Sequence, residues 1–281
     1  MHHFLKIMKH AKVLFVSQEI TPYLPETEMS KIGRYLPQGI QERGREIRTF
    51  MPKYGCINER RNQLHEVIRL SGMNLIIDDT DHPLIIKVAS IQSARMQVYF
   101  IDNEDYFHRK AVLTDGEGQY FPDNDERSIF FARGVLETVR KLRWSPDIIH
   151  CHGWITSLLP LYLKKAYYDD PLYMNSKVIY SIYNDEFDKP LEKKFNKKLL
   201  MEGINASDVS ILNNPNFENL TRMALSMSDA IIIGSSEINK NIRRYIKTMN
   251  KPVLEYKPED EYVDAYSKFY DKILTNRVDE D

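Results

Sequence analysis

Short runs of apolar residues alternate along this chain with longer stretches in which apolar residues recur every three or four positions. The first run, residues 13–16, is rich in β-branched residues and stops abruptly at polar residues 17–19, as is typical of a strand buried on both faces. From Glu28 onward the apolar residues follow one helical stripe until Gly44, which has the place of a helix C-cap. Such pairs of strand and helix recur, which predicts an α/β fold.

Further strands and helices are expected from the same patterns. Strands are predicted at residues 46–51, 96–101, 147–152, 177–182 and 230–233, and helices at residues 126–143, 154–168, 217–228 and 237–249. Residues 64–101 instead show period-two segments separated by turn residues, which predicts antiparallel hairpins. Residues 103–125 are rich in Asp, Asn, Gly and aromatic residues, and they are predicted to form a long surface loop.

The alternation of strands and helices favours a Rossmann-like, doubly wound and mainly parallel sheet with a β-hairpin insertion. We predict that this single domain spans residues 1–257. Residues 258–281 are predicted to form a C-terminal amphipathic helix, rich in tyrosine, and an acidic tail at residues 279–281. Both are expected to dock on the same domain.

Charge is nearly balanced, since 39 Lys and Arg stand against 40 Asp and Glu and give a formal net charge of −1. No basic field therefore favours nucleic acid as a partner. Lysine pairs such as Lys193-Lys194 and Lys197-Lys198 are interpreted as solvated faces rather than phosphate-binding tracks.

Cysteine usage and the lengths of the apolar runs bear on the compartment. The only cysteines are Cys56 and Cys151, which favours a reducing compartment and argues against a disulfide framework or a zinc site. No cofactor and no metal are predicted. Residues 1–10 lack the apolar segment of a signal peptide, and the apolar runs are far shorter than the roughly 20 residues that span a bilayer. We expect a soluble cytoplasmic protein without a membrane partner.

In a doubly wound sheet, ligands bind in the crevice beyond the carboxyl ends of the strands. The polar residues predicted to lie there are Glu19, Lys53, Tyr54, His150, His152, Asn184, Asp185, Ser235 and Ser236, with Asp123 and Asn124 from the preceding loop. No glycine-rich dinucleotide motif, Walker lysine, nucleophile elbow or zinc-protease motif accompanies them. These residues therefore indicate a ligand crevice without an assigned reaction, and no catalytic residue is predicted.

Histidines flank a cysteine in the predicted strand at residues 147–152. We expect His150 and His152 to point to opposite faces, so that they do not share a metal ion. Of the two, His152 is the better candidate for hydrogen bonding to a sugar hydroxyl, although the residues alone favour a half-buried histidine satisfied by the neighbouring backbone. Cys151 is predicted to be a small core residue. Asp123 and Asn124 could bind a sugar or cap a helix, and the pattern leaves both alternatives open.

Several stretches together resemble one known family. They are KVLFVSQEITPY at residues 12–23, LPQGIQERG at 36–44, MPKYG at 51–55, YFPDNDER at 120–127, SPDIIHCHGW at 145–154 and SDAIIIGSSEI at 228–238. They are similar to the N-terminal domain of bacterial glycogen synthases and plant starch synthases, the retaining glycosyltransferases of family five. The resemblance implies one half of a two-domain GT-B fold that closes over ADP-glucose and an α-1,4-glucan. It also implies a sugar crevice formed by Glu19, Asp123, Asn124, His152 and Asn184.

The chain departs from that family at the loop that contacts the nucleotide sugar. The family has K-T-G-G-L where this chain has residues 25–29, P-E-T-E-M. Proline lacks a backbone donor, and the carboxylates of Glu26 and Glu28 repel a diphosphate. The nucleotide-binding C-terminal domain of the family also has no counterpart in these 281 residues. The resemblance therefore implies a glycosyltransferase domain that is inactive alone.

Three hypotheses remain open on these grounds. The first is a glycosyltransferase domain that becomes active when another chain supplies the nucleotide-binding domain. The second is a non-catalytic or regulatory module that binds an α-glucan or a maltooligosaccharide. The third is a structural role, in which the former interdomain face joins a protein partner or a second copy of the chain.

Overall fold

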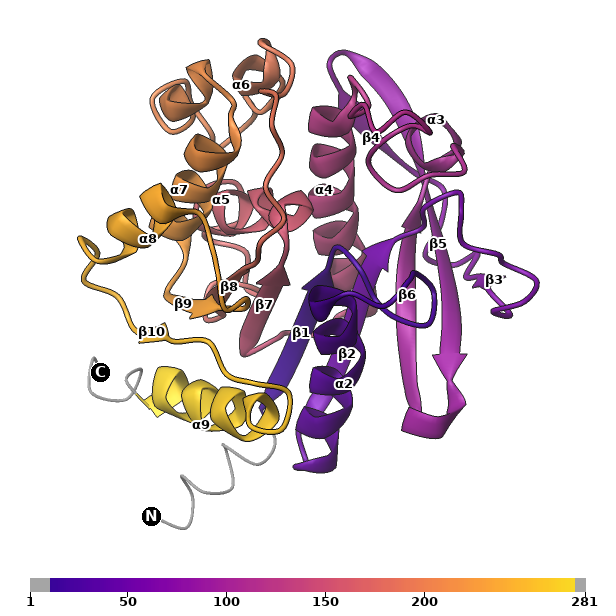
Figure 1. Ribbon diagram of the computed structural model, residues 1–281. Helices are drawn as coiled ribbons and strands as arrows, with labels where there is room; N and C mark the ends of the chain where they lie inside the picture. Colours follow the sequence, from indigo (N-terminus) through magenta and orange to yellow (C-terminus); the bar gives the residue numbers. More distant parts are fainter. Residues whose placement is uncertain (1–10, 276–281) are drawn as a thin grey trace.

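A mostly parallel sheet forms the centre of the molecule (Figure 1). The computed structural model describes residues 11–275. Its strands are β1 (Lys12–Ser17), β2 (Glu46–Pro52), β3 (His65–Glu66), β4 (Met73–Ile77), β5 (Thr80–Ile91), β6 (Met96–Asp102), β7 (Ile148–His152), β8 (Lys177–Ile182), β9 (Ala230–Ile233) and β10 (Val253–Leu254). Its α-helices are α2 (Glu28–Glu42), α3 (Glu104–Phe107), α4 (Asn124–Leu142), α5 (Leu158–Lys164), α6 (Phe195–Lys198), α7 (Phe217–Met227), α8 (Lys240–Ile246) and α9 (Tyr262–Thr275).

The strand order in the sheet is β10-β9-β8-β7-β1-β2-β6-β5-β3, with β4 paired to β5. All pairs from β10 to β6 are parallel, whereas β5 pairs antiparallel with β6, β3 and β4. The doubly wound sheet with a hairpin insertion is thereby confirmed. Because the parallel strands all end at one edge, their polar tips converge there.

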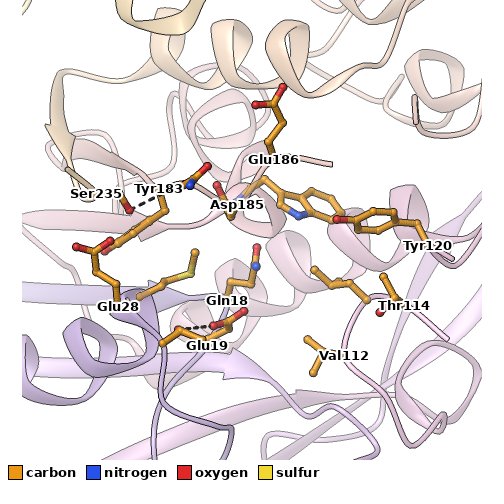
Figure 2. Close-up of a pocket in the computed structure, with 15 residues that line it drawn as sticks. Gln18, Glu19, Glu28, Val112, Thr114, Tyr120, Tyr183, Asp185, Glu186 and Ser235 are labelled. Atoms are coloured by element: carbon orange, nitrogen blue, oxygen red, sulfur yellow. Dashed lines mark hydrogen bonds between the residues drawn. The ribbon is translucent and has the colours of Figure 1, made fainter. Parts of the chain in front are cut away.

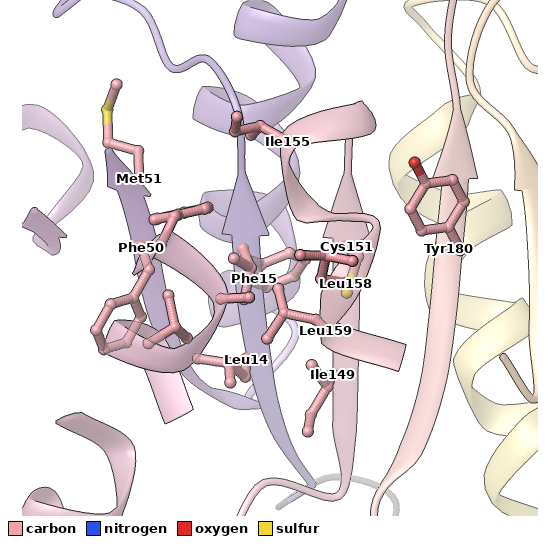
Figure 3. Close-up of a cluster of buried hydrophobic side chains, with 14 of the residues drawn as sticks. Leu14, Phe15, Phe50, Met51, Ile149, Cys151, Ile155, Leu158, Leu159 and Tyr180 are labelled. Carbon is pink, nitrogen blue, oxygen red and sulfur yellow. The ribbon is translucent and has the colours of Figure 1, made fainter. Parts of the chain in front are cut away.

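Alternate residues of each strand enter two separate layers of the core. Phe15 of β1 faces α9, and its ring centroid lies 6.5 Å from that of Tyr270. On the opposite face, Leu14 and Ile149 pack with Leu158 and Leu159 of the α5 region (Figure 3). Burial on both faces explains why the central strands have continuous apolar sequences.

Helix α9 packs against α2 and the sheet. Arg45 forms an ion pair of 2.5 Å with Asp271, and Arg43 forms another with Asp264. The rings of Tyr262, Tyr266 and Tyr270 are buried, so they are covered by the chain itself. The expectations for residues 1–10 and for the acidic tail at residues 279–281 lie outside the described residues.

Two predicted segments differ from the observed structure. Residues 103–125 are not only a surface loop, because they contain α3, in which Tyr106 and Phe107 are buried. The helix predicted at residues 154–168 divides into a 3-10 turn, Trp154–Thr156, and the shorter α5. In both segments the apolar residues enter the core from turns and short helices. A search for helical periodicity does not predict such positions.

The interpretation of Lys197-Lys198 as a solvated pair is wrong for Lys198. Its side chain is only 6% exposed, and its Nζ lies 2.8 Å from Asp125 Oδ2 and 2.7 Å from Glu126 Oε1. Helix α6 buries Phe195, and one helical turn later this places Lys198 against the start of α4. The lysine therefore fastens the segment after β8 to α4.

Candidate functional site

A cavity of about 580 Å³ lies beyond the carboxyl ends of β1, β7, β8 and β9 (Figure 2). It is lined by Gln18, Glu19, Thr27, Glu28, Met29, Val112, Leu113, Thr114, Tyr120, Trp154, Tyr183, Asn184, Asp185, Glu186 and Ser235. The residues come from the strand tips, from the start of α2 and from the loop before α4. This is the edge at which open α/β sheets bind ligands.

The lining of this cavity is acidic. It contains the carboxylates of Glu19, Glu28, Asp185 and Glu186, and the lining residues include no Lys, Arg or His. Carboxylates accept hydrogen bonds from hydroxyl groups and repel anions. The cavity is therefore suited to a neutral ligand with many hydroxyl groups.

Asp185 is held at the floor of the cavity. One of its oxygens accepts a hydrogen bond of 2.8 Å from the backbone N–H of Trp154. Burial raises the pKa of the Asp185 carboxyl to about 7; the Trp154 hydrogen bond opposes this shift, and the negative charge of Glu19 adds to it. Near neutral pH this carboxyl is present in both protonation states, so it can donate or accept a hydrogen bond.

The N-terminus of α2, which faces the cavity, is satisfied by the chain itself. Thr27 Oγ1 accepts a hydrogen bond of 3.0 Å from the Ser30 N–H, and Ser30 Oγ accepts one of 2.8 Å from the Thr27 N–H. Thr27 Oγ1 also donates to Glu19 Oε2 over 2.7 Å. This capping box consumes donors that a helix N-terminus otherwise offers to an anion, and Glu28 adds negative charge in the first turn.

Glu19 and Asn184, two of the five predicted sugar-binding residues, line the cavity. Asp185 and Ser235 from the wider set of strand-tip residues join them, and the Asn184 N–H donates to Ser235 Oγ over 3.2 Å. Lys53 is directed elsewhere, because its Nζ forms an ion pair of 2.6 Å with Glu59. Four polar side chains predicted at three strand tips thus lie around one cavity.

The expectation that His150 and His152 lie on opposite faces is wrong. Residues two apart on a strand share a face, and the two ring centroids are 3.8 Å apart. His152 is fully buried and does not line the cavity; its Nδ1 lies 2.7 Å from the Tyr183 hydroxyl. Burial lowers the pKa of His152 to about 3, so its ring is neutral. The His152 ring contacts the cavity lining through Tyr183.

Asp123 and Asn124 do not line the cavity either. Asn124 has no exposed surface, its Nδ2 donates to the Leu113 carbonyl over 2.9 Å, and its Oδ1 accepts from Arg127 over 2.7 Å. Asp123 pairs with Arg109 at 2.7 Å and makes no side-chain cap bond to α4. Both residues hold the loop that lines one wall of the cavity, and their contact with a sugar stays a prediction.

Several lining residues were not among the predicted site residues. They include Gln18, Tyr120, Trp154, Tyr183 and Glu186. Tyr183 directly follows β8, so its position at a strand tip is a signal that could have identified it. Tyr120 lies in an irregular loop, and no periodicity places its ring.

Gly33 permits α2 to approach the loop after β1. A Cβ atom at this position would lie 2.6 Å from the backbone carbonyl oxygen of Glu19. We expect Gly33→Ala to lower the free energy of unfolding by about 1–3 kcal/mol through overpacking, and to displace Glu19. Urea denaturation measures the change, with Gly116→Ala as the control, since no atom lies within 4 Å of a Cβ there. Equal stability of the two variants would contradict the predicted clash.

Residues 11–275 contain neither a candidate metal site nor a candidate membrane span. No group of three or more His, Cys, Asp or Glu side chains there could hold a metal ion. No helix in that part of the chain has the length and apolar character required to cross a membrane.

Comparison with known proteins gives consistent results. The family model described as starch synthase catalytic domain matches residues 12–251. Glycogen synthases from Chlorobium limicola and Chlorobium luteolum are 39% and 40% identical over 200 residues, which is 71% of this chain and 41% of each relative. The chain therefore spans about two fifths of the length of these relatives.

A solved structure shows the same fold. The catalytic domain of Starch Synthase IV from Arabidopsis thaliana, bound to ADP and acarbose, superposes with a TM-score of 0.69 at 16% identity. The match covers 88% of this chain and 51% of that chain.

Proposed function

This chain belongs to the family of starch synthase catalytic domains, and we propose that it binds a neutral α-glucan in the cavity at the strand ends without transferring glucose by itself. One observation carries the proposal. The cavity presents four carboxylates, and its lining includes no basic side chain. By this proposal, the chain is a glycogen or starch synthase-like domain whose cavity binds the saccharide and not the nucleotide.

The chemistry of the cavity supports a saccharide as the ligand. Sugar hydroxyls can donate to the carboxylates of Glu19 and Glu186, while the partly exposed ring of Tyr120 offers apolar surface. The related Starch Synthase IV structure is bound to ADP and to acarbose, a diphosphate and a sugar-like compound. The acidic lining of the cavity favours a sugar-like ligand over a diphosphate.

The same cavity disfavours a nucleotide diphosphate. Each carboxylate within about 4 Å of a phosphate would cost on the order of 1–4 kcal/mol, depending on solvent exposure. Glycosyl transfer from ADP-glucose also requires positive charge to stabilise the leaving diphosphate. Pro25, Glu26 and Glu28 supply none, and Thr27 caps α2.

A second candidate function is transfer that is completed from outside this chain. The curated glycogen synthases extend well beyond the matched region, which favours a requirement for further residues. If another chain supplied cationic groups at the cavity mouth, the bound glucan could act as the acceptor. A protein partner, a homo-oligomer and a cytoplasmic location stay predictions.

A calorimetric binding screen with maltotriose, ADP and ADP-glucose tests the proposal. We expect maltotriose to bind with a Kd of about 1 mM or tighter, which corresponds to roughly −4 kcal/mol, and we expect no binding of either nucleotide. Tyr120→Ala should weaken maltotriose binding about fivefold or more. Tyr168→Ala, whose side chain is 65% exposed and outside the cavity, is the control.

Two outcomes of this screen would contradict the proposed function. One is the absence of saccharide binding at millimolar concentrations. The other is binding or turnover of ADP-glucose by the chain alone.

A further inference from the structure

A second cavity, of about 240 Å³, adjoins the first one. It lies between α2 and the segment that leads into α9, and it is lined by Glu28, Lys31, Ile32, Tyr256, Lys257, Glu259 and Tyr262. Glu28 belongs to the lining of both cavities. The two cavities therefore have Glu28 as a common wall residue.

The outer wall of this second cavity is joined to α2 by polar contacts. Lys31 Nζ and Glu259 Oε2 form an ion pair of 2.9 Å, the Tyr262 ring is 5% exposed, and the Tyr256 hydroxyl donates to the Glu28 carboxylate. The family match ends at residue 251, so Tyr256, Glu259 and Tyr262 lie beyond it. The second cavity is thus built in part by residues outside the matched family region.

The charges of the second cavity balance one another. Two carboxylates, of Glu28 and Glu259, face two ammonium groups, of Lys31 and Lys257. A neutral ligand meets no net charge there, and the four groups offer both donors and acceptors. The partly exposed ring of Tyr256 adds rigid, amphipathic surface at a low cost in conformational entropy.

We propose that the second cavity is a further sugar subsite, which takes a later residue of the same glucan chain that occupies the first cavity. This inference rests on the proposed function, because it requires the glucan to be held in the first cavity. Glu28 lines both cavities. Its carboxylate can accept hydrogen bonds from sugar hydroxyl groups in either one. The partly exposed ring of Tyr256 then provides the surface on which the sugar ring rests.

The consequence is that affinity depends on chain length. A maltooligosaccharide long enough to reach both cavities makes its second contact within the same complex, at high effective concentration. One or two additional hydrogen bonds at that contact correspond to about a tenfold gain. We expect maltoheptaose to bind about tenfold more tightly than maltotriose.

Calorimetry on the full chain and its Tyr256→Ala variant tests this subsite. In the variant, the affinity for maltoheptaose should fall about tenfold, while the affinity for maltotriose should change much less, because Tyr256 touches the first cavity only by its bond to Glu28. Tyr256→Phe, which keeps the ring and loses only the hydroxyl, should show a smaller loss for maltoheptaose. Tyr168→Ala is the matched exposed-tyrosine control, and thermal unfolding establishes that each variant is folded.

The outcomes separate this inference from the proposed function. If maltotriose fails to bind the unmodified chain, the proposed function is wrong. If maltotriose binds but affinity does not rise with chain length, or if Tyr256→Ala weakens both saccharides equally, the subsite is refuted while the proposed function stands. Competition by ADP against maltoheptaose but not against maltotriose would also overturn the subsite, since it would assign the second cavity to a nucleotide.

Discussion

Replacement of Lys198 by methionine is expected to lower the free energy of unfolding by about 3–5 kcal/mol at pH 8. Methionine has a similar length but no charge, so the variant leaves Asp125 without its cationic partner. The Asp125 side chain has no exposed surface, and its Oδ1 already lacks a hydrogen bond. Removal of one partner leaves a buried charge without a counter-ion. For this reason, breaking a buried ion pair costs more stability than the intact pair contributes.

The loss should depend on pH. Burial raises the pKa of the Asp125 carboxyl against the opposing effect of Lys198, and the variant removes that opposition. A carboxyl with a raised native pKa contributes stability that is fully present below the pKa of the unfolded chain, and that is lost as pH rises through the native pKa. We therefore expect a smaller loss at pH 4 than at pH 8.

Urea denaturation at both pH values measures these effects. Lys193→Met, at an exposed lysine of the same segment, is the control and should change stability by less than about 0.5 kcal/mol. The double variant with Asp125→Asn should recover much of the loss, because it removes the unpaired charge. Equal effects of Lys198→Met and Lys193→Met at pH 8 would show that the pair does not stabilise the fold.

Lys198 also shows why part of the structure could not be predicted from the sequence. Its partner Asp125 lies 73 residues away in the chain, so no local pattern distinguishes Lys198 from the exposed Lys197. The central strands were predictable because burial on both faces requires continuous apolar residues at each one. Local periodicity reports burial, but it does not report which distant charges meet.

The residues of the candidate site likewise fall into those that the sequence could predict and those that it could not. Glu19 and Asn184 directly follow buried strands, so their arrival at one edge follows from the topology alone. Asn124 was proposed by resemblance, yet the structure places it behind the cavity wall. Tyr120 reaches the cavity through an irregular loop, whose path depends on tertiary contacts rather than on local sequence.

The altered segment at residues 25–29 links the sequence to the proposed function. Substitution of a family lysine and two glycines by P-E-T-E predicted only that phosphate binding would be disfavoured. The structure shows what these residues do instead, since Thr27 caps α2 and bonds to Glu19. Glu28 lines both cavities. Residues 25–29 therefore contribute to an acidic surface that lines the two cavities and is hydrogen-bonded within itself.

Replacement of Asp185 by asparagine is expected to stabilise the protein at pH 8 but not at pH 4. Burial is the main cause that raises the pKa of this carboxyl from 3.8 to about 7. Its protonated form therefore contributes stability that is complete below about pH 4 and is lost as pH rises through about 7. The displacement corresponds to at most about 4 kcal/mol, and solvent at the cavity edge reduces the expected effect to roughly 2 kcal/mol.

Asparagine keeps an acceptor for the Trp154 N–H, which lies 2.8 Å from Asp185 Oδ2, but it never carries the charge that burial penalises. The stability difference between variant and wild type should therefore be near zero at pH 4 and grow to about 2 kcal/mol in favour of the variant at pH 8. Urea denaturation at several pH values measures this difference, with Asp188→Asn on the exposed part of the same segment as the control. A difference that stays constant across this range would mean that Asp185 does not titrate near neutral pH, and it would contradict this prediction.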